Sequence, residues 1–103
     1  MNSSEKIEDT QMNELIDEGL KELLRLVYEI DDPKLLEDFF RCLFTPAELV
    51  DISKRWLLVK EIEKGTTQRE IAKKYRLSLC KITRGSKELK KDYSAFRKLL
   101  DRI

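Results

Sequence analysis

The sequence predicts an all-α protein of about six helices. Only three glycines and two prolines occur among its 103 residues, and no segment alternates β-branched and polar residues as a strand would. Hydrophobic residues make up 41% and charged residues 40%, a balance too apolar for a disordered chain and too charged for a membrane protein. We expect one helical domain over 11–103 and a disordered N-terminal tail over 1–10.

The first two predicted helices are amphipathic. A long helix is expected over about 11–30, and Asp31-Asp32-Pro33 ends it. Asp32 can cap the next helix, about 33–43, with Pro33 at its first position, where a missing N–H does no harm. Apolar residues recur at steps of three and four in both segments: Met12, Leu15, Ile16, Leu20, Leu23, Leu24, Val27 and Ile30, then Leu35, Leu36, Phe39 and Phe40.

The third predicted helix has clear signals at both ends. Thr45 caps it, Pro46 opens it, and Glu48 completes a capping box. It runs to Lys64 and stops at Gly65, a typical C-terminal glycine. Its middle, 56–59, is apolar all round, so we expect this stretch to be enclosed on every side.

The remaining helices are short. Thr67 and Glu70 form a second capping box that opens a helix over about 67–75, and Ser78 can cap a helix over about 78–91. A last helix over about 93–103 carries four apolar residues at helical spacing: Phe96, Leu99, Leu100 and Ile103. The apolar stripes of the first and last helices exceed what six short helices can cover, which predicts a twofold homodimer.

Charge is distributed unevenly along the chain. Residues 1–50 hold 5 basic and 13 acidic side chains, whereas residues 64–91 hold 10 basic and only 2 acidic ones. A basic block inside a protein of net charge +1 indicates a surface for a polyanion such as nucleic acid.

Residues 68–86 fit a helix-turn-helix, within a unit of about 67–91. Arg76 stands in the turn, where the motif usually has glycine to allow a left-handed conformation, so mild strain is expected there. Ile71, Ala72 and Tyr75 would face inward from the first helix and Ile82 from the second, and Leu77 lies in the turn.

In a helix-turn-helix the second helix enters the major groove with its N-terminal residues at the base edges. Leu79 and Cys80 can touch thymine methyl groups, Lys81 can reach guanine or a phosphate, and Arg69 is the best candidate for a bidentate guanine contact. The predicted base-edge residues are Ser78, Leu79, Cys80, Lys81 and Thr83. The predicted phosphate contacts are Gln68, Lys73, Lys74, Lys87, Lys90 and Lys91. Specificity would then depend on water and DNA shape.

Three collinear segments resemble the bacterial tryptophan repressor family. They are LFTPAELVDISKRW (43–56), GTTQREIAKKY (65–75) and ITRGSKELK (82–90), within a similarity that covers about residues 41–91. ITRGS followed by Leu89-Lys90 is the most specific part. The resemblance implies an intertwined all-α homodimer that binds operator DNA, with L-tryptophan as corepressor, and controls genes of tryptophan biosynthesis or uptake.

The resemblance also implies a ligand slot between the third helix and the second helix of the helix-turn-helix, which we call the reading helix. Arg55 and Arg84 would sandwich the indole ring, and Arg84 and the Thr45 hydroxyl would meet the carboxylate. The backbone carbonyls of Cys42 and Phe44 would accept from the ammonium, Val59 would line the slot, and Gly85 would lie against the indole. A side chain at Gly85 would then project into the slot, so Gly85→Val is expected to abolish the ligand response more than folding.

Two positions depart from the family pattern. Glu88 stands where the family commonly has serine near the ligand's amino group, and Lys81 stands where it commonly has threonine in the reading helix. Glu88 can pair either with a ligand ammonium or with Lys87, Lys91 or Arg84 on its own helix.

Three functions are compatible with these features. The first is a tryptophan-dependent transcriptional repressor; the second is a DNA-binding regulator of the same fold with a different ligand or none; the third is a helical dimerisation adaptor. An enzyme is not expected, because the chain has no histidine, no glycine-rich phosphate loop and no nucleophile–base pair.

The cellular setting follows from composition. The acidic, polar N-terminus is unlike a signal peptide, and no apolar run approaches the roughly 20 residues of a membrane span, so a cytoplasmic protein is expected. Cys42 and Cys80 lack metal-ligand spacing and are expected to be buried and reduced. We predict no metal site and no cofactor apart from the corepressor.

Overall fold

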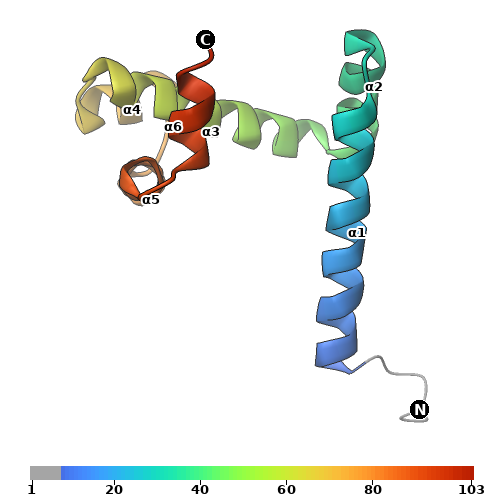
Figure 1. The fold of residues 1–103 in the computed structure, drawn as a ribbon. Helices are drawn as coiled ribbons and strands as arrows, with labels where there is room; N and C mark the ends of the chain where they lie inside the picture. Colours follow the sequence, from blue (N-terminus) through green and yellow to red (C-terminus); the bar gives the residue numbers. More distant parts are fainter. Residues whose placement is uncertain (1–7) are drawn as a thin grey trace. The chain divides into compact units, whose positions relative to one another are not determined.

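The computed structural model describes residues 8–103, and within them it contains helices and no strand, which confirms the predicted all-α class (Figure 1). The helices are α1 (Asp9–Glu29), α2 (Pro33–Leu43), α3 (Pro46–Lys64), α4 (Gln68–Tyr75), α5 (Leu79–Lys90) and α6 (Ala95–Leu100). The predicted tail lies mostly outside the described residues, but residues 9 and 10 are helical. The chain divides into two compact units, one ending at Leu43 and one over Phe44–Ile103. The single domain expected over 11–103 stays a prediction.

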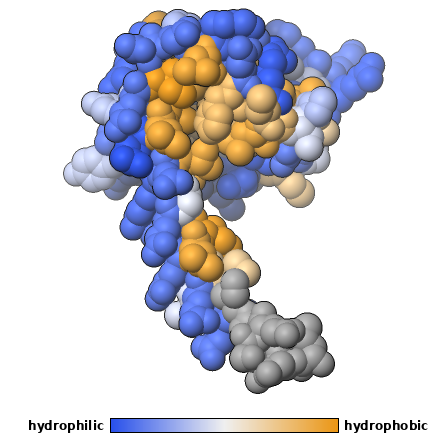
Figure 2. Space-filling model, turned by 90° about the vertical axis from the view of Figure 1, so that its right-hand side faces the viewer, coloured by the Kyte–Doolittle hydropathy of each residue, from blue (hydrophilic) through white to orange (hydrophobic). Residues whose placement is uncertain are grey.

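The first unit consists of α1 and α2, and neither helix contains a buried residue in the single chain. Glu8 and Gln11 form a capping box at the start of α1, a start that the sequence prediction placed two residues too late. Asp32 caps α2 as predicted, because its carboxylate accepts a hydrogen bond from the Lys34 N–H at 3.0 Å. Hydrophobic side chains remain on the surface of α1 (Figure 2), including Leu24 at 58% exposure.

α3 begins and ends as its local chemistry dictates. The Glu48 N–H donates to the Thr45 hydroxyl at 3.2 Å, and the Thr45 N–H donates to the Glu48 carboxylate at 2.9 Å, so the predicted capping box is complete. Gly65 ends the helix at φ 87°, a left-handed conformation that glycine adopts without strain. Leu58 and Val59 are buried, but Leu57 is 37% exposed, so complete enclosure of 56–59 is wrong for the single chain.

Leu58 and Val59 point into two different clusters, because successive helical residues are about 100° apart. In the second unit, α4, α5 and α6 gather around the C-terminal half of α3 (Figure 1). The first cluster joins α3 to the helix-turn-helix: Leu58, Ile71 and Ile82, with Ile62, Ala72, Tyr75 and Leu77 packed against it. The second joins α3 to α5 and α6: Val59, Leu89 and Leu100, with Trp56, Ile62 and Phe96. The predicted inward positions of Ile71, Ala72, Tyr75 and Ile82 are therefore confirmed, and the turn residue Leu77 packs against the same cluster.

The turn between α4 and α5 has the left-handed residue that the motif requires. Arg76 lies at φ 54°, ψ 50°, a region that a residue with a Cβ occupies with strain. The N–H groups of Arg76 and Leu77 both donate to the Ala72 carbonyl and close the end of α4. Each helix then starts with a hydroxyl cap: Thr67 accepts from the Glu70 N–H at 3.2 Å, and Ser78 accepts from the Lys81 N–H at 3.3 Å.

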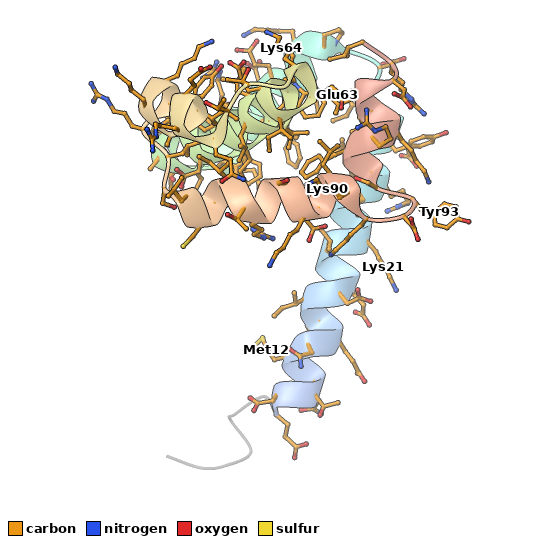
Figure 3. All side chains as sticks on the ribbon, turned by 90° about the vertical axis from the view of Figure 1, so that its left-hand side faces the viewer. Met12, Lys21, Glu63, Lys64, Lys90 and Tyr93 are labelled. Carbon is orange, nitrogen blue, oxygen red and sulfur yellow. The ribbon has the colours of Figure 1, made fainter. Side chains whose placement is uncertain are left out.

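The last helix is shorter than predicted. Tyr93 lies at φ 60° and cannot continue a right-handed helix, and its side chain points away from the protein (Figure 3). Ser94 then caps α6, which ends at Leu100. Leu100 is buried, whereas Leu99 and Ile103 are exposed, so the predicted apolar stripe is only partly covered by the chain itself.

Both cysteines are free and exposed, so the prediction that they are buried is wrong. Cys80 lies two residues before the buried Ile82, and this separation places it about 200° away, on the outer face of α5. Cys42 belongs to α2, which buries no residue in the single chain.

Candidate ligand pocket and nucleic-acid interface

A cavity of about 330 Å³ lies among α3, α5 and α6, a size near the lower end for small-molecule sites. Four of its residues come from α5 at helical spacing, so they share one face of that helix. The complete lining is Arg55, Leu58, Val59, Lys81, Arg84, Gly85, Glu88 and Phe96.

The lining combines an apolar floor with a cationic rim. Leu58 and Val59 are buried at 2% and 1% exposure and supply aliphatic surface. Arg55, Lys81 and Arg84 bring three positive charges to the cavity, against the single carboxylate of Glu88. Guanidinium planes stack on aromatic rings and also pair with carboxylates. The cavity therefore suits a flat apolar ligand that carries an anionic group.

Gly85 lines the cavity, and the side of its Cα that lacks a side chain faces Leu58 and Ile62 of α3. A Cβ built at Gly85 would lie 3.1 Å from Leu58 Cδ2 and 4.0 Å from Ile62 Cδ1. The glycine thus lets α5 pack closely on α3. A side chain here would meet Leu58, which lines the same cavity, so Gly85→Val would also disturb packing; its effect on the ligand response stays a prediction.

Glu88 is paired within its own helix. The Lys91 ammonium lies 2.8 Å from Glu88 Oε1. This hydrogen bond lowers the pKa of the Glu88 carboxyl, and the nearby Arg84 charge lowers it further. Of the alternatives that the sequence left open, the Lys91 pair is therefore the one present. The carboxylate stays charged at the edge of the cavity.

The outer surface of the helix-turn-helix is basic and exposed. The predicted base-edge residues Ser78, Leu79, Cys80, Lys81 and Thr83 are all exposed, and so is Arg69, the predicted guanine contact. Five of the predicted phosphate contacts are exposed as well: Gln68, Lys73, Lys87, Lys90 and Lys91. Leu79 is 58% exposed, an unusual position for a leucine and one that would let it touch a thymine methyl group.

Lys74 differs from the other predicted phosphate contacts. Its ammonium lies 2.9 Å from Glu61 Oε2, and that carboxylate is only 7% exposed. Sequence analysis missed Glu61, although a signal existed: Glu61 follows the core residue Leu58 by three positions, which places it on the face of α3 that meets α4. Lys74 is therefore the partner of a buried carboxylate, although its side chain is 61% exposed, and its predicted phosphate contact stays a prediction.

Comparison with known proteins identifies the family. The family model described as Trp repressor protein matches residues 18–103. The chain belongs to the Trp repressor family. Two relatives carry the description Trp operon repressor homolog. The one from Chlamydia trachomatis serovar L2 is 34% identical over 85 residues, which span 82% of this chain and 90% of the relative. The one from Chlamydia caviae is 36% identical over 86 residues, which span 82% and 85%. No solved structure gives a significant match.

The Trp repressor family is a family of regulatory proteins and not a family of enzymes. Within residues 8–103, no group of three or more histidine, cysteine, aspartate or glutamate side chains is placed to hold a metal ion. The helices that the structure describes include none with the length and apolar character of a membrane span.

The structure brings together most of the residues that the Trp repressor resemblance implied for the ligand. Arg55, Val59, Arg84, Gly85 and Glu88 all line the cavity. Thr45 does not, since it caps α3 ten residues before Arg55, about 15 Å away along the helix axis. Phe44 precedes Thr45, and Cys42 belongs to the other compact unit.

Three further residues line the cavity without having been predicted for it. Lys81 was predicted to face DNA, yet it precedes Arg84 by three positions and therefore shares its face. Leu58 is adjacent to the predicted Val59. Phe96 reaches the cavity from α6, across a turn that no local sequence pattern specifies.

Proposed function

We propose that the protein is a tryptophan-dependent repressor that binds operator DNA as a homodimer. The observation that carries the proposal is the cavity directly against α5, with Arg55 and Arg84 in its lining and aliphatic residues at its floor. A ligand in this place touches both the scaffold helix α3 and the reading helix α5. The operon named in the description of the relatives supports genes of tryptophan biosynthesis or uptake as the target.

In this proposal, the indole ring lies between the guanidinium groups of Arg55 and Arg84, over Leu58 and Val59, and Arg84 pairs with the carboxylate. The Thr45 hydroxyl accepts from the Glu48 N–H and keeps its own hydrogen free to donate to the carboxylate. Because Thr45 is about 15 Å along α3 from Arg55 in the same chain, a second copy of the chain would supply it. The carbonyls of Cys42 and Phe44 would come with that copy and accept from the ammonium.

The homodimer is supported by apolar side chains that the single chain leaves exposed. They lie on α1, α2 and α6 and include Leu15, Ile16, Leu20, Leu24, Leu35 and Leu99, between 48% and 60% exposed. Surfaces of this kind are normally covered by a partner. A twofold dimer would also present two reading helices to successive major grooves.

The ligand would act by stabilising the orientation of α5 in which the protein can bind DNA. A ligand shifts a conformational equilibrium only by the difference in its affinity for the two states. Because the ligand would contact α3 and α5 together, it would bind tightest when α5 lies at one particular angle to α3. Arg69 and the first turn of α5 would then meet base edges, and Lys73, Lys87 and Lys90 would meet phosphates.

Fluorescence anisotropy with a duplex recovered by in vitro selection tests this function. We expect L-tryptophan to tighten DNA binding by about tenfold or more, since allosteric couplings usually fall in a range of about 5- to 150-fold. Arg69→Ala serves as a control that weakens DNA binding and leaves tryptophan binding intact. Equal DNA affinity with and without tryptophan would contradict the proposal.

A second candidate is favoured by the two charged departures at the cavity. Lys81 and Glu88 both line it, so its charge differs from that of a pocket with threonine and serine at these positions. The second candidate is the same DNA-binding regulator with another ligand. Calorimetric titration with L-tryptophan, indole-3-acetate and other amino acids separates the two. Binding of another compound together with no heat and no thermal shift from tryptophan would favour this candidate.

A further inference from the structure

A buried carboxylate connects α3 to the end of α4. Glu61 is 5% exposed and lies one turn before the end of α3. Its carboxylate accepts three hydrogen bonds: from the Thr66 hydroxyl at 3.0 Å, from the Lys74 ammonium at 2.9 Å and from the Tyr75 hydroxyl at 2.7 Å. We call Glu61, Thr66, Lys74 and Tyr75 the Glu61 network.

The network is fully satisfied and charged. The hydrogen bonds from Lys74, Tyr75 and Thr66 lower the pKa of the Glu61 carboxyl to about 2 and outweigh the effect of burial. In the described residues, no buried side-chain nitrogen or oxygen lacks a hydrogen-bond partner. The Lys74 ammonium also lies 5.3 Å from the centre of the Tyr75 ring. A buried, satisfied set of this kind fixes the geometry of the groups that it joins.

The network is attached to the strained turn of the helix-turn-helix. Tyr75 is the last residue of α4, and Arg76, the next residue, is in the left-handed conformation. A strained backbone conformation persists only where surrounding contacts determine it. Packing of Ile71 fixes the middle of α4. At its end, the Tyr75 hydroxyl and the Lys74 ammonium are held by a carboxylate of α3.

We propose that Glu61 is a positioning residue for DNA recognition: it holds the end of α4 against α3 and so keeps Arg76 in the left-handed turn that sets the angle between α4 and α5. The DNA-binding part of this inference rests on the function proposed above. A second consequence concerns Lys74. Its side chain is 61% exposed, but its charge is paired with the Glu61 carboxylate, so it releases no counterion on DNA binding, in contrast to its neighbour Lys73.

The first test uses amide hydrogen exchange of the turn in the full-length protein. In Glu61→Gln the loss of charge should speed exchange of the Leu77 amide, which bonds to the Ala72 carbonyl, by about tenfold relative to the Leu89 amide. Tyr75→Phe should act in the same direction, since it keeps the ring and removes the hydroxyl. Glu63→Gln is the matched control, because it breaks the 2.6 Å ion pair between α3 and Arg97 of α6.

The second test is a double-mutant cycle with Arg76→Gly. Glycine adopts the left-handed conformation without strain, so the turn no longer needs the Glu61 network. We expect Glu61→Gln to weaken binding to the selected duplex several-fold in the Arg76 background, and to have little effect when residue 76 is glycine. Lys73→Ala should lower the slope of log DNA affinity against log salt concentration by about 1, because one phosphate contact is lost. Lys74→Ala should weaken DNA binding and leave that slope unchanged.

The outcomes separate the two proposals. The positioning role is overturned if Glu61→Gln leaves Leu77 exchange unchanged, if Glu63→Gln speeds it equally, or if Arg76→Gly does not suppress the effect. If in vitro selection enriches no DNA sequence, the proposed function fails, and the exchange measurements still decide whether Glu61 holds the turn. An equal loss of salt dependence in Lys73→Ala and Lys74→Ala overturns the assignment of Lys74.

Discussion

The two helices of the helix-turn-helix share a basic character but are held in different ways. Both are short and basic and start with a hydroxyl cap. α4 is fixed to α3 by the fully buried Ile71 and by the Glu61 network. α5 contributes half of the residues that line the cavity, whereas α4 contributes none. α5 is also packed on α3 through the fully buried Ile82, so the two helices differ in the Glu61 network and in the cavity and not in whether they contact the core.

The largest expected effect comes from removing the cationic contact between ligand and α5. Arg84→Ala deletes both a charged hydrogen bond to the carboxylate and a stacking surface, so the affinity for L-tryptophan should fall about a hundredfold. Isothermal titration calorimetry measures this directly. Arg69→Ala on α4 is the comparison and should leave the tryptophan affinity unchanged. An unchanged affinity in Arg84→Ala would remove α5 from the ligand site.

Packing of α5 on α3 gives the next largest effect. Gly85→Val places a branched side chain against Leu58 and should destabilise the fold by about 2 kcal/mol, the usual range for overpacking. Gly19→Ala is the matched control in α1, where nothing lies within 4 Å of the new Cβ. It should stabilise the helix by about 1 kcal/mol. Urea denaturation at one protein concentration compares them. An unchanged midpoint in Gly85→Val would contradict the close approach of the two helices.

A smaller effect is expected at Lys81. Its side chain is exposed at the rim of the cavity, and exposed charge pairs contribute little, so Lys81→Thr should weaken tryptophan binding only about threefold. Lys73→Thr changes the same residue type on α4 and should have no effect on tryptophan. Calorimetry on both variants tests whether, of the two helices of the helix-turn-helix, only α5 contacts the ligand. A loss of tryptophan affinity in Lys73→Thr as well would show that the contrast between the two helices is wrong.

These lysines also show what the sequence could and could not predict. The limits of α2 and α3 were predictable because caps such as Thr45 and Gly65 act on neighbouring residues. The pairing of Lys74 with Glu61 and the place of Lys81 in the cavity lining were not predictable, since each depends on which residues the fold brings near. Gly85 is the same case, because only the packed structure shows that its open side faces Leu58. The late start of α6 was not predictable either, because it depends on the left-handed conformation of Tyr93, which no local sequence pattern indicates.

The smallest expected effect is the contribution of the Glu61 network to the pH dependence of stability. It is absent near neutral pH and appears only in acid. The pKa of the Glu61 carboxyl falls from 4.5 to about 2 on folding, so the stabilisation is present above pH 4.5 and is lost as the pH falls toward 2. Urea midpoints should therefore show no Glu61 contribution to pH dependence between pH 7 and 5, and a progressive loss below 4.5. Glu61→Gln should flatten the acid part of the profile, whereas Glu63→Gln should flatten it less, because its partner Arg97 is half exposed and solvent screens that pair. Identical profiles for the wild type and Glu61→Gln would mean that the carboxylate does not hold α4, and the two helices would then differ only in that α5 lines the cavity.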